Sequence, residues 1–157
     1  MKSIRTIVVI LTFMFAFNAQ AQKVKIKKDV AYVDKVEYLK FDDCGTFSAS
    51  CTVMNLDDED VIILQYHSFE KPNPVARNPK SKAPYQSMVT ESYAELRFLD
   101  IELECEVQLT KKKLIKALYK SKVFNKDGTV NKENAEKFAR KYHRNVSGNR
   151  PTLIITN

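Results

Sequence analysis

The sequence predicts an α+β fold, in which an antiparallel β-sheet of about six strands is followed by two C-terminal helices packed on one face. Up to Leu109, apolar and polar side chains alternate with a period of two, which is typical of half-buried strands. After Thr110, apolar residues recur three and four positions apart, which is typical of amphipathic helices. Strands followed by helices favour this segregated architecture.

The strand region divides at polar turns. Short alternating runs occupy residues 24–28, 30–34 and 36–41. Residues 46–69 predict one hairpin, because the run GTFSASCTVM alternates cleanly and the polar turn NLDDED separates it from the apolar run VIILQYHSF. Residues 22–109 are therefore expected to be mainly β.

A change of face is predicted close to Leu99. Apolar residues are even-numbered up to Phe98 and odd-numbered from Leu99 onward. Because side chains of a regular strand alternate strictly, a bulge or tight turn should separate strands 92–98 and 101–109. The second strand would place four acids on its solvent side and the intervening residues beneath the helices; the acids are Asp100, Glu102, Glu104 and Glu106.

Residues 70–91 predict a loop or a chain of turns, because they hold four of the five prolines. Loops of this length are often functional. Its basic and aromatic side chains are the candidate partner-binding residues: Lys71, Arg77, Lys80, Lys82 and Tyr85.

Two helices are predicted within residues 110–145. Thr110 is expected to cap the first helix through its hydroxyl, with Gly128 as the stop, and Asn131 is expected to cap the second. The predicted buried residues are Leu114, Ile115 and Leu118 in the first helix, and Ala135, Phe138, Ala139 and Tyr142 in the second. Residues 146–157 would then form a C-terminal tail or an edge strand.

The first 21 residues have the three parts of a secretory signal peptide. Two basic residues precede an apolar run of 12 residues, Thr6 to Phe17, and Ala19 and Ala21 form an A-x-A cleavage site. As a helix this run would rise about 18 Å, against roughly 30 Å of hydrocarbon. We therefore expect cleavage after Ala21, export to the periplasm or cell exterior, a single domain over 22–157, and no membrane span after cleavage. The ending AQAQ resembles that of Bacteroidota signal peptides.

Charge is unevenly distributed along the chain. Residues 22–109 carry 11 basic and 16 acidic side chains, whereas residues 110–157 carry 13 basic and 3 acidic ones. One interpretation is that the two oppositely charged halves attract each other and pack together. The other is that an anionic or envelope partner binds the basic 70–91 loop and the lysine-rich helices. Aromatic and basic residues do not alternate in a stacking pattern, so nucleic acid is not expected as a partner.

The cysteines predict no catalytic chemistry. Cys51 and Cys105 fall on apolar strand faces and are the candidate disulfide if their strands are neighbours, whereas Cys44 with Cys51 would close a short loop. There is no C-x-x-C pattern and there are only two histidines, so we expect no metal site and no cofactor. Residues 123–134 echo a calcium loop but lack carboxylates at its first and last positions.

These observations favour an exported, non-catalytic binding or structural module. The alternative is a hydrolase that uses carboxylates of the Asp100–Glu106 row, although without tryptophan the sequence shows little sign of a sugar platform. A hydrophobic ligand between sheet and helices would require an empty apolar cavity. The closing pattern KDGTVNKENAEKFARKY resembles the ends of other small exported Bacteroidota proteins.

The signal-peptide prediction has a direct test. The exported protein should begin at Gln22, because signal peptidase cuts after the small residue that ends the A-x-A site. Intact-mass measurement of protein recovered from the periplasm or medium checks this, and a mass that still includes residues 1–21 would contradict it.

Overall fold

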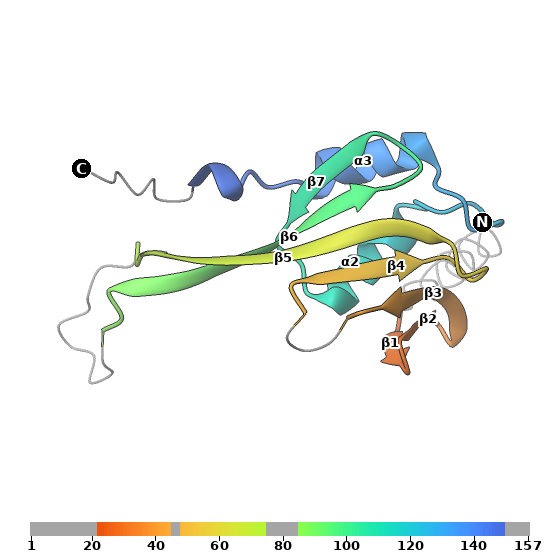
Figure 1. Cartoon of the computed structure of the whole chain (residues 1–157), viewed down its shortest axis with the longest axis horizontal. Helices are drawn as coiled ribbons and strands as arrows, with labels where there is room; N and C mark the ends of the chain where they lie inside the picture. The colour runs from red at the N-terminus through yellow and green to blue at the C-terminus, as the bar shows by residue number, and fades with distance from the viewer. Residues whose placement is uncertain (1–21, 45–47, 75–84, 150–157) are drawn as a thin grey trace, which may run out of the picture.

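Seven strands lie in one antiparallel sheet in the same order as in the chain. The computed structural model describes residues 22–44, 48–74 and 85–149 (Figure 1). The α+β class and the antiparallel sheet are confirmed, with one strand more than predicted. The elements are β1 (Val24–Lys27), β2 (Val30–Val33), β3 (Val36–Asp42), β4 (Ser50–Met54), β5 (Asp60–Pro72), β6 (Met88–Phe98), β7 (Leu103–Val107), α2 (Lys111–Lys120), α3 (Lys132–Tyr142) and the 3₁₀-helix η2 (Ser147–Asn149).

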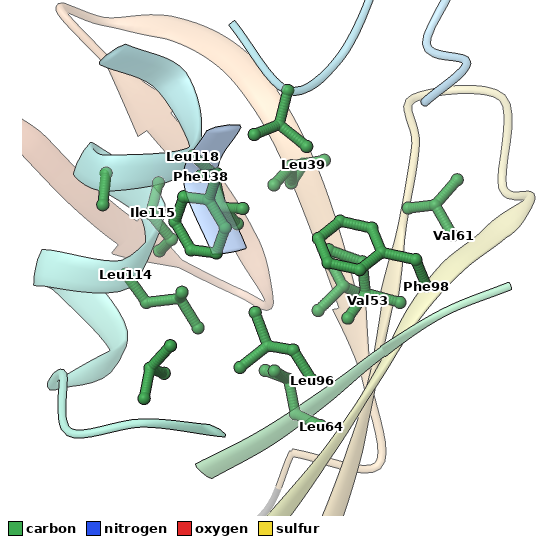
Figure 2. Close-up of a cluster of buried hydrophobic side chains, with 14 of the residues drawn as sticks. Leu39, Val53, Val61, Leu64, Leu96, Phe98, Leu114, Ile115, Leu118 and Phe138 are labelled. Carbon is green, nitrogen blue, oxygen red and sulfur yellow. The ribbon is translucent and has the colours of Figure 1, made fainter. Parts of the chain in front are cut away.

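Both helices contribute to one hydrophobic core with the inward-facing side chains of the sheet. Figure 2 shows Ile115 of α2 and Phe138 of α3 near Leu39, with Leu64 and Leu96 of the long strands below. The predicted buried residues of α2 and α3 are confirmed, except that Tyr142 is only half-buried. Among the helices described, none is long and apolar enough to cross a membrane.

The helix ends differ in part from the prediction. Asn131 caps α3 as predicted, with its side-chain oxygen accepting from Asn134 N at 3.0 Å. Thr110 occupies the N-cap position of α2, but only its backbone carbonyl is used, accepting from Leu114 N at 2.9 Å; the predicted hydroxyl cap is wrong. The helix also ends well before Gly128. Lys122 adopts a left-handed conformation (φ 53°) and, with Val123, donates back to the last turn, which closes the helix in a Schellman motif.

The change of face between β6 and β7 occurs in a tight turn, as predicted. Strand β6 ends at Phe98, residues 99–102 form the turn, and β7 begins at Leu103. Strand β7 is shorter than the predicted 101–109, so Asp100 and Glu102 belong to the turn and only Glu104 and Glu106 lie on the strand.

The predicted 70–91 loop is shorter than expected. Strands β5 and β6 continue to pair as far as Pro72 and Met88, so both ends of this segment are strand, and Figure 1 shows them as a long projecting arm. Proline is tolerated because Asn73 N donates to Ser87 O at 2.8 Å, and in the alternating antiparallel pattern the nitrogen of Pro72 then faces away from β6. Residues 75–84 lie outside the described residues.

The candidate Cys51–Cys105 disulfide, which required neighbouring strands, is not formed. Cys51 pairs with Cys44, the alternative that the sequence left open, at a Cα–Cα distance of 4.5 Å, and Cys105 is a buried free thiol. The strand order explains this, because β4 and β7 are separated by β5 and β6, or roughly 14 Å at 4.7–4.9 Å per strand. A disulfide requires Cα atoms within about 7 Å.

The C-terminal segment was expected to be a tail or an edge strand over 146–157. Val146 is buried, and Ser147–Asn149 form the short helix η2 instead of a strand. Residues 150–157 lie outside the described part of the chain, as does the predicted signal peptide.

The free thiol provides a test of this core. Cys105 is 3% exposed, and burial raises the pKa of its thiol to about 12, so the reactive thiolate is scarce near neutral pH. A bulky thiol reagent should therefore leave native protein unlabelled and add one label after unfolding without reductant. Mass spectrometry reads both states, and fast labelling of native protein would show that the face of β7 is assigned wrongly.

Candidate functional site

The predicted partner-binding residues do not form a described surface. Arg77, Lys80 and Lys82 lie outside the described residues, and Tyr85 is exposed. Lys71 lies on β5 and forms an ion pair with Glu91 of β6. Hydrogen bonds from Lys71 and then Gln108 lower the pKa of Glu91, so the charge of Lys71 is already neutralised by an ionised carboxylate.

The acidic row Asp100–Glu106 does not converge on one point. Asp100 and Glu102 are exposed in the β6–β7 turn, and Glu104 is paired with Arg97 across the strands, with Nε and Oε1 2.6 Å apart. Hydrolysis by paired carboxylates requires two acids facing one substrate, with one of them held protonated by a raised pKa. This arrangement is not present among the four described acids.

Glu106 instead anchors the C-terminal segment. Its Oε2 accepts from Val146 N at 2.7 Å and from Ser147 N at 2.9 Å, and its backbone oxygen accepts from Arg144 N at 2.9 Å. Burial acts to raise the pKa of Glu106, but the bonds from Ser147 and Val146 outweigh it and lower the pKa. An ionised carboxylate is thus used structurally, and it secures residues 144–147 against the outer edge of β7.

The two histidines of the chain, which the sequence places 76 positions apart, line one hollow of about 400 Å³ on the sheet face opposite the helices. His67 stacks on Tyr93, with ring centroids 4.9 Å apart, and its Nε2 lies 3.3 Å from Glu95 Oε2. His143 Nδ1 accepts from Glu106 N at 3.2 Å. Within the described ranges, no three His, Cys, Asp or Glu side chains are placed to hold a metal ion. His143 and Glu106 are engaged with each other, whereas His67 Nε2 is buried near Glu95 without a hydrogen bond.

A second hollow is better suited to bind a ligand, and it depends on a bulge in β3. The register pairs Ala31 with Leu39 and Tyr32 with Glu37, which leaves Tyr38 without a partner on β2. Such a bulge changes the direction of a side chain. Tyr38 is therefore half-buried against the core and the helical layer, whereas regular alternation would have sent it to the opposite face with Lys40.

Tyr38 meets two other aromatic rings at the end of α2. Its ring lies 5.0 Å from Tyr119 and 5.9 Å from Phe124, with interplanar angles of 80° and 78°. Both are edge-to-face arrangements, which aromatic pairs favour. Tyr38 thus forms one apolar floor with Tyr119 and Phe124, which lie more than 80 positions later in the sequence.

The Tyr38 pocket is the hollow of about 670 Å³ around this floor, a size typical of small-molecule sites. Three lysines line it, and none of them forms an ion pair in the described parts of the chain. Of the described lining residues, none carries a carboxylate. The lining comprises Gln22, Tyr38, Tyr119, Lys120, Lys122, Phe124, Asn125, Lys126, Asn131 and Asn134.

Hydrogen bonds hold the three asparagine amides of the pocket in place. Asn125 Nδ2 donates to Thr129 Oγ1, Asn131 Nδ2 donates to Asn125 Oδ1, and Asn134 Nδ2 donates to Lys122 O, each at 3.0 Å. Each amide nitrogen has two hydrogens, so each retains a second N–H after these bonds. The segment that echoes a calcium loop is thus an interhelical turn held together by its own side chains.

No family model, curated protein or solved structure matches the chain.

Sequence reasoning missed the Tyr38 pocket for an identifiable reason. The lysine-rich helix was recognised, but nothing in the run VEYLKF marks the bulge that turns Tyr38 toward the helices. The signal that was available is the cluster of three lysines within residues 120–126 beside Tyr119 and Phe124, immediately after the predicted apolar stripe.

The anchoring role of Glu106 predicts a pH dependence. Its folded pKa is lowered, so its contribution to stability is present above the unfolded value of about 4.3 and is lost as pH falls through the lower folded value. Glu106→Gln should therefore lower the free energy of unfolding at pH 7, and the difference from wild type should narrow below about pH 4. Urea melts at several pH values measure this. Glu102→Gln, in the exposed turn, should show no such convergence; identical pH profiles for the two variants would contradict the anchor.

Proposed function

We propose that this protein is an exported, non-catalytic binding module that holds an anionic ligand or envelope partner in the Tyr38 pocket. The observation that carries the proposal is that, among the described residues, the lining of one hollow has three lysines without ion pairs and no carboxylate. Like charges around one hollow repel one another, and an anion relieves that repulsion. The sequence indicates an anionic partner for the lysine-rich helices as one of two alternatives, and this proposal assigns that partner to the Tyr38 pocket.

Lack of an ion pair does not by itself mark the site, because Lys112, Lys113 and Lys116 also form none within the described residues; the pocket differs in gathering three lysines around one hollow without a carboxylate. Elsewhere, Lys40, Lys71, Arg97 and Lys137 each have an acidic partner. Lys111 lies over the ring of Phe41, with its Nζ 5.2 Å from the centroid. The lysines of the pocket, at the end of α2 and in the turn that follows, form no ion pair within the described residues. A disulfide between Cys44 and Cys51 supports export, because such bonds persist in oxidising compartments.

The hydrolase alternative has no comparable support. Its acids are divided between a turn and a strand, one is paired with Arg97, and Glu106 is committed to the C-terminal segment. No observation therefore favours a second function over binding.

A charge-reversal pair tests the site. Lys122→Glu with Lys126→Glu should weaken binding to heparin, a soluble polyanion, by roughly 10-fold, or about 1.4 kcal/mol. Both side chains are exposed, so folding should be retained. Titration at about 0.1 M salt measures the dissociation constant, and circular dichroism confirms the fold.

The matched control reverses the same amount of charge elsewhere. Lys112 and Lys113 are exposed in the first turn of α2 and do not line the pocket. Lys112→Glu with Lys113→Glu should weaken binding by no more than about 3-fold, through net charge alone. Equal losses in the two double variants would mean that the basic protein binds anions non-specifically, and would sink the proposed site.

A further inference from the structure

We propose that the ligand of the Tyr38 pocket is an acidic sugar unit, a uronic acid residue of a glycan, with its ring on the aromatic floor and its carboxylate at the lysines. This inference rests on the proposed function and specifies its ligand. It is carried by three features that occur together in this hollow: aromatic rings, positioned neutral donors and lysines without ion pairs in the described residues.

The aromatic floor suits a flat, partly apolar ring. Tyr119 is 39% exposed although it packs edge-to-face with Tyr38, so part of its ring remains open to a ligand. Aromatic side chains combine an apolar face with a polar edge, and a pyranose likewise combines C–H faces with peripheral hydroxyls. A simple inorganic anion would use the lysines and would leave this floor uncovered.

Neutral hydrogen-bonding groups surround the floor at fixed positions. Tyr38 Oη is buried and lacks a hydrogen-bond partner, and buried polar groups of this kind are uncommon in folded proteins. Burial, with a contribution from Tyr119, raises the pKa of the Tyr38 phenol well above its usual range, so it stays protonated as a donor. The second N–H groups of the three asparagines add donors that are already oriented, and a polyhydroxylated ring offers acceptors for both kinds.

The charge of the lining selects an acid over a neutral sugar. Lys120, Lys122 and Lys126 contribute three positive charges, and the described lining contributes no negative charge. A neutral glycan would leave these cations unpaired, whereas one carboxylate per ring places a negative charge beside the stacked face. An ammonium group on the ligand would be repelled.

The experiment uses the mature protein and a panel of short uronic acid oligomers, from galacturonate, glucuronate and mannuronate. Their methyl esters provide uncharged matches, and inorganic phosphate provides an anion without a ring. Calorimetric titration should show saturable binding of at least one acidic oligomer, at least about 10-fold tighter than its ester and than phosphate.

Three tyrosine variants separate stacking from charge. Tyr119→Ala should weaken binding of the preferred oligomer by at least about 10-fold, and Tyr38→Phe, which removes only the hydroxyl, by at least about 3-fold. Tyr85→Ala is the control, because Tyr85 is similarly exposed at 43% and lies outside the pocket. It should bind like wild type, and thermal melts should confirm that all three variants fold.

The outcomes distinguish the two proposals. If phosphate binds as tightly as the acids and the esters bind more weakly, or if Tyr119→Ala has no effect while Lys122→Glu with Lys126→Glu does, the sugar inference is overturned and the anion site stands. If the uncharged esters bind as tightly as the acids, the pocket does not recognise charge and both proposals are overturned. If no oligomer binds at millimolar concentration, the sugar inference is likewise overturned. If Lys122→Glu with Lys126→Glu also binds heparin as tightly as Lys112→Glu with Lys113→Glu, the proposed function is overturned together with the sugar inference.

Discussion

Burial of one face of the sheet is the constraint on which the rest of the structure depends. Seven strands joined only to their sequence neighbours form an open sheet, and their inward-facing residues are apolar from β2 to β7. The strands cannot cover this face themselves, so α2 and α3 must do so, and their buried residues complete the same core. Burying side chains such as Leu96, Ile115 and Phe138 contributes roughly 1.5–3 kcal/mol each before the loss of conformational entropy.

Covering the sheet with two helices forces the segment between them back against the strands, and this creates the Tyr38 pocket. The turn around Gly128 (φ 81°) lies against Asn55, and a Cβ at that glycine would stand 3.0 Å from Asn55 Cβ. Asn55 is 1% exposed and accepts from Asp57 N and Glu59 N, so the β4–β5 turn is itself rigid where the interhelical turn meets it. The pocket therefore lies between the interhelical turn, which packs against Asn55, and the bulge of β3.

The alternation of side chains was sufficient to predict the fold class, the turn at Leu99 and the buried stripes of both helices, because each follows from local periodicity. Features that depend on partners could not be predicted in this way. The choice between the two possible disulfides of Cys51 depends on strand order, the extension of β5 to Pro72 depends on pairing with Met88, and the direction of Tyr38 depends on a register shift against β2. The Tyr38 pocket was missed because it depends on contacts between residues that are distant in the sequence, and local periodicity does not reveal such contacts.

The Tyr38 pocket combines unsatisfied groups of two kinds in one place. A sequence that specifies its fold well pairs its charges and buried polar atoms, and departures from this rule concentrate at functional sites. Single unsatisfied groups also occur elsewhere: His67 Nε2 on the outer sheet face lies near Glu95 but makes no hydrogen bond, and Lys112, Lys113 and Lys116 form no ion pair within the described residues. At the Tyr38 pocket, three lysines without ion pairs and a buried phenol without a hydrogen-bond partner meet in one hollow. Folding alone gives no reason to gather these groups, whereas an anionic ligand with hydroxyls would satisfy both.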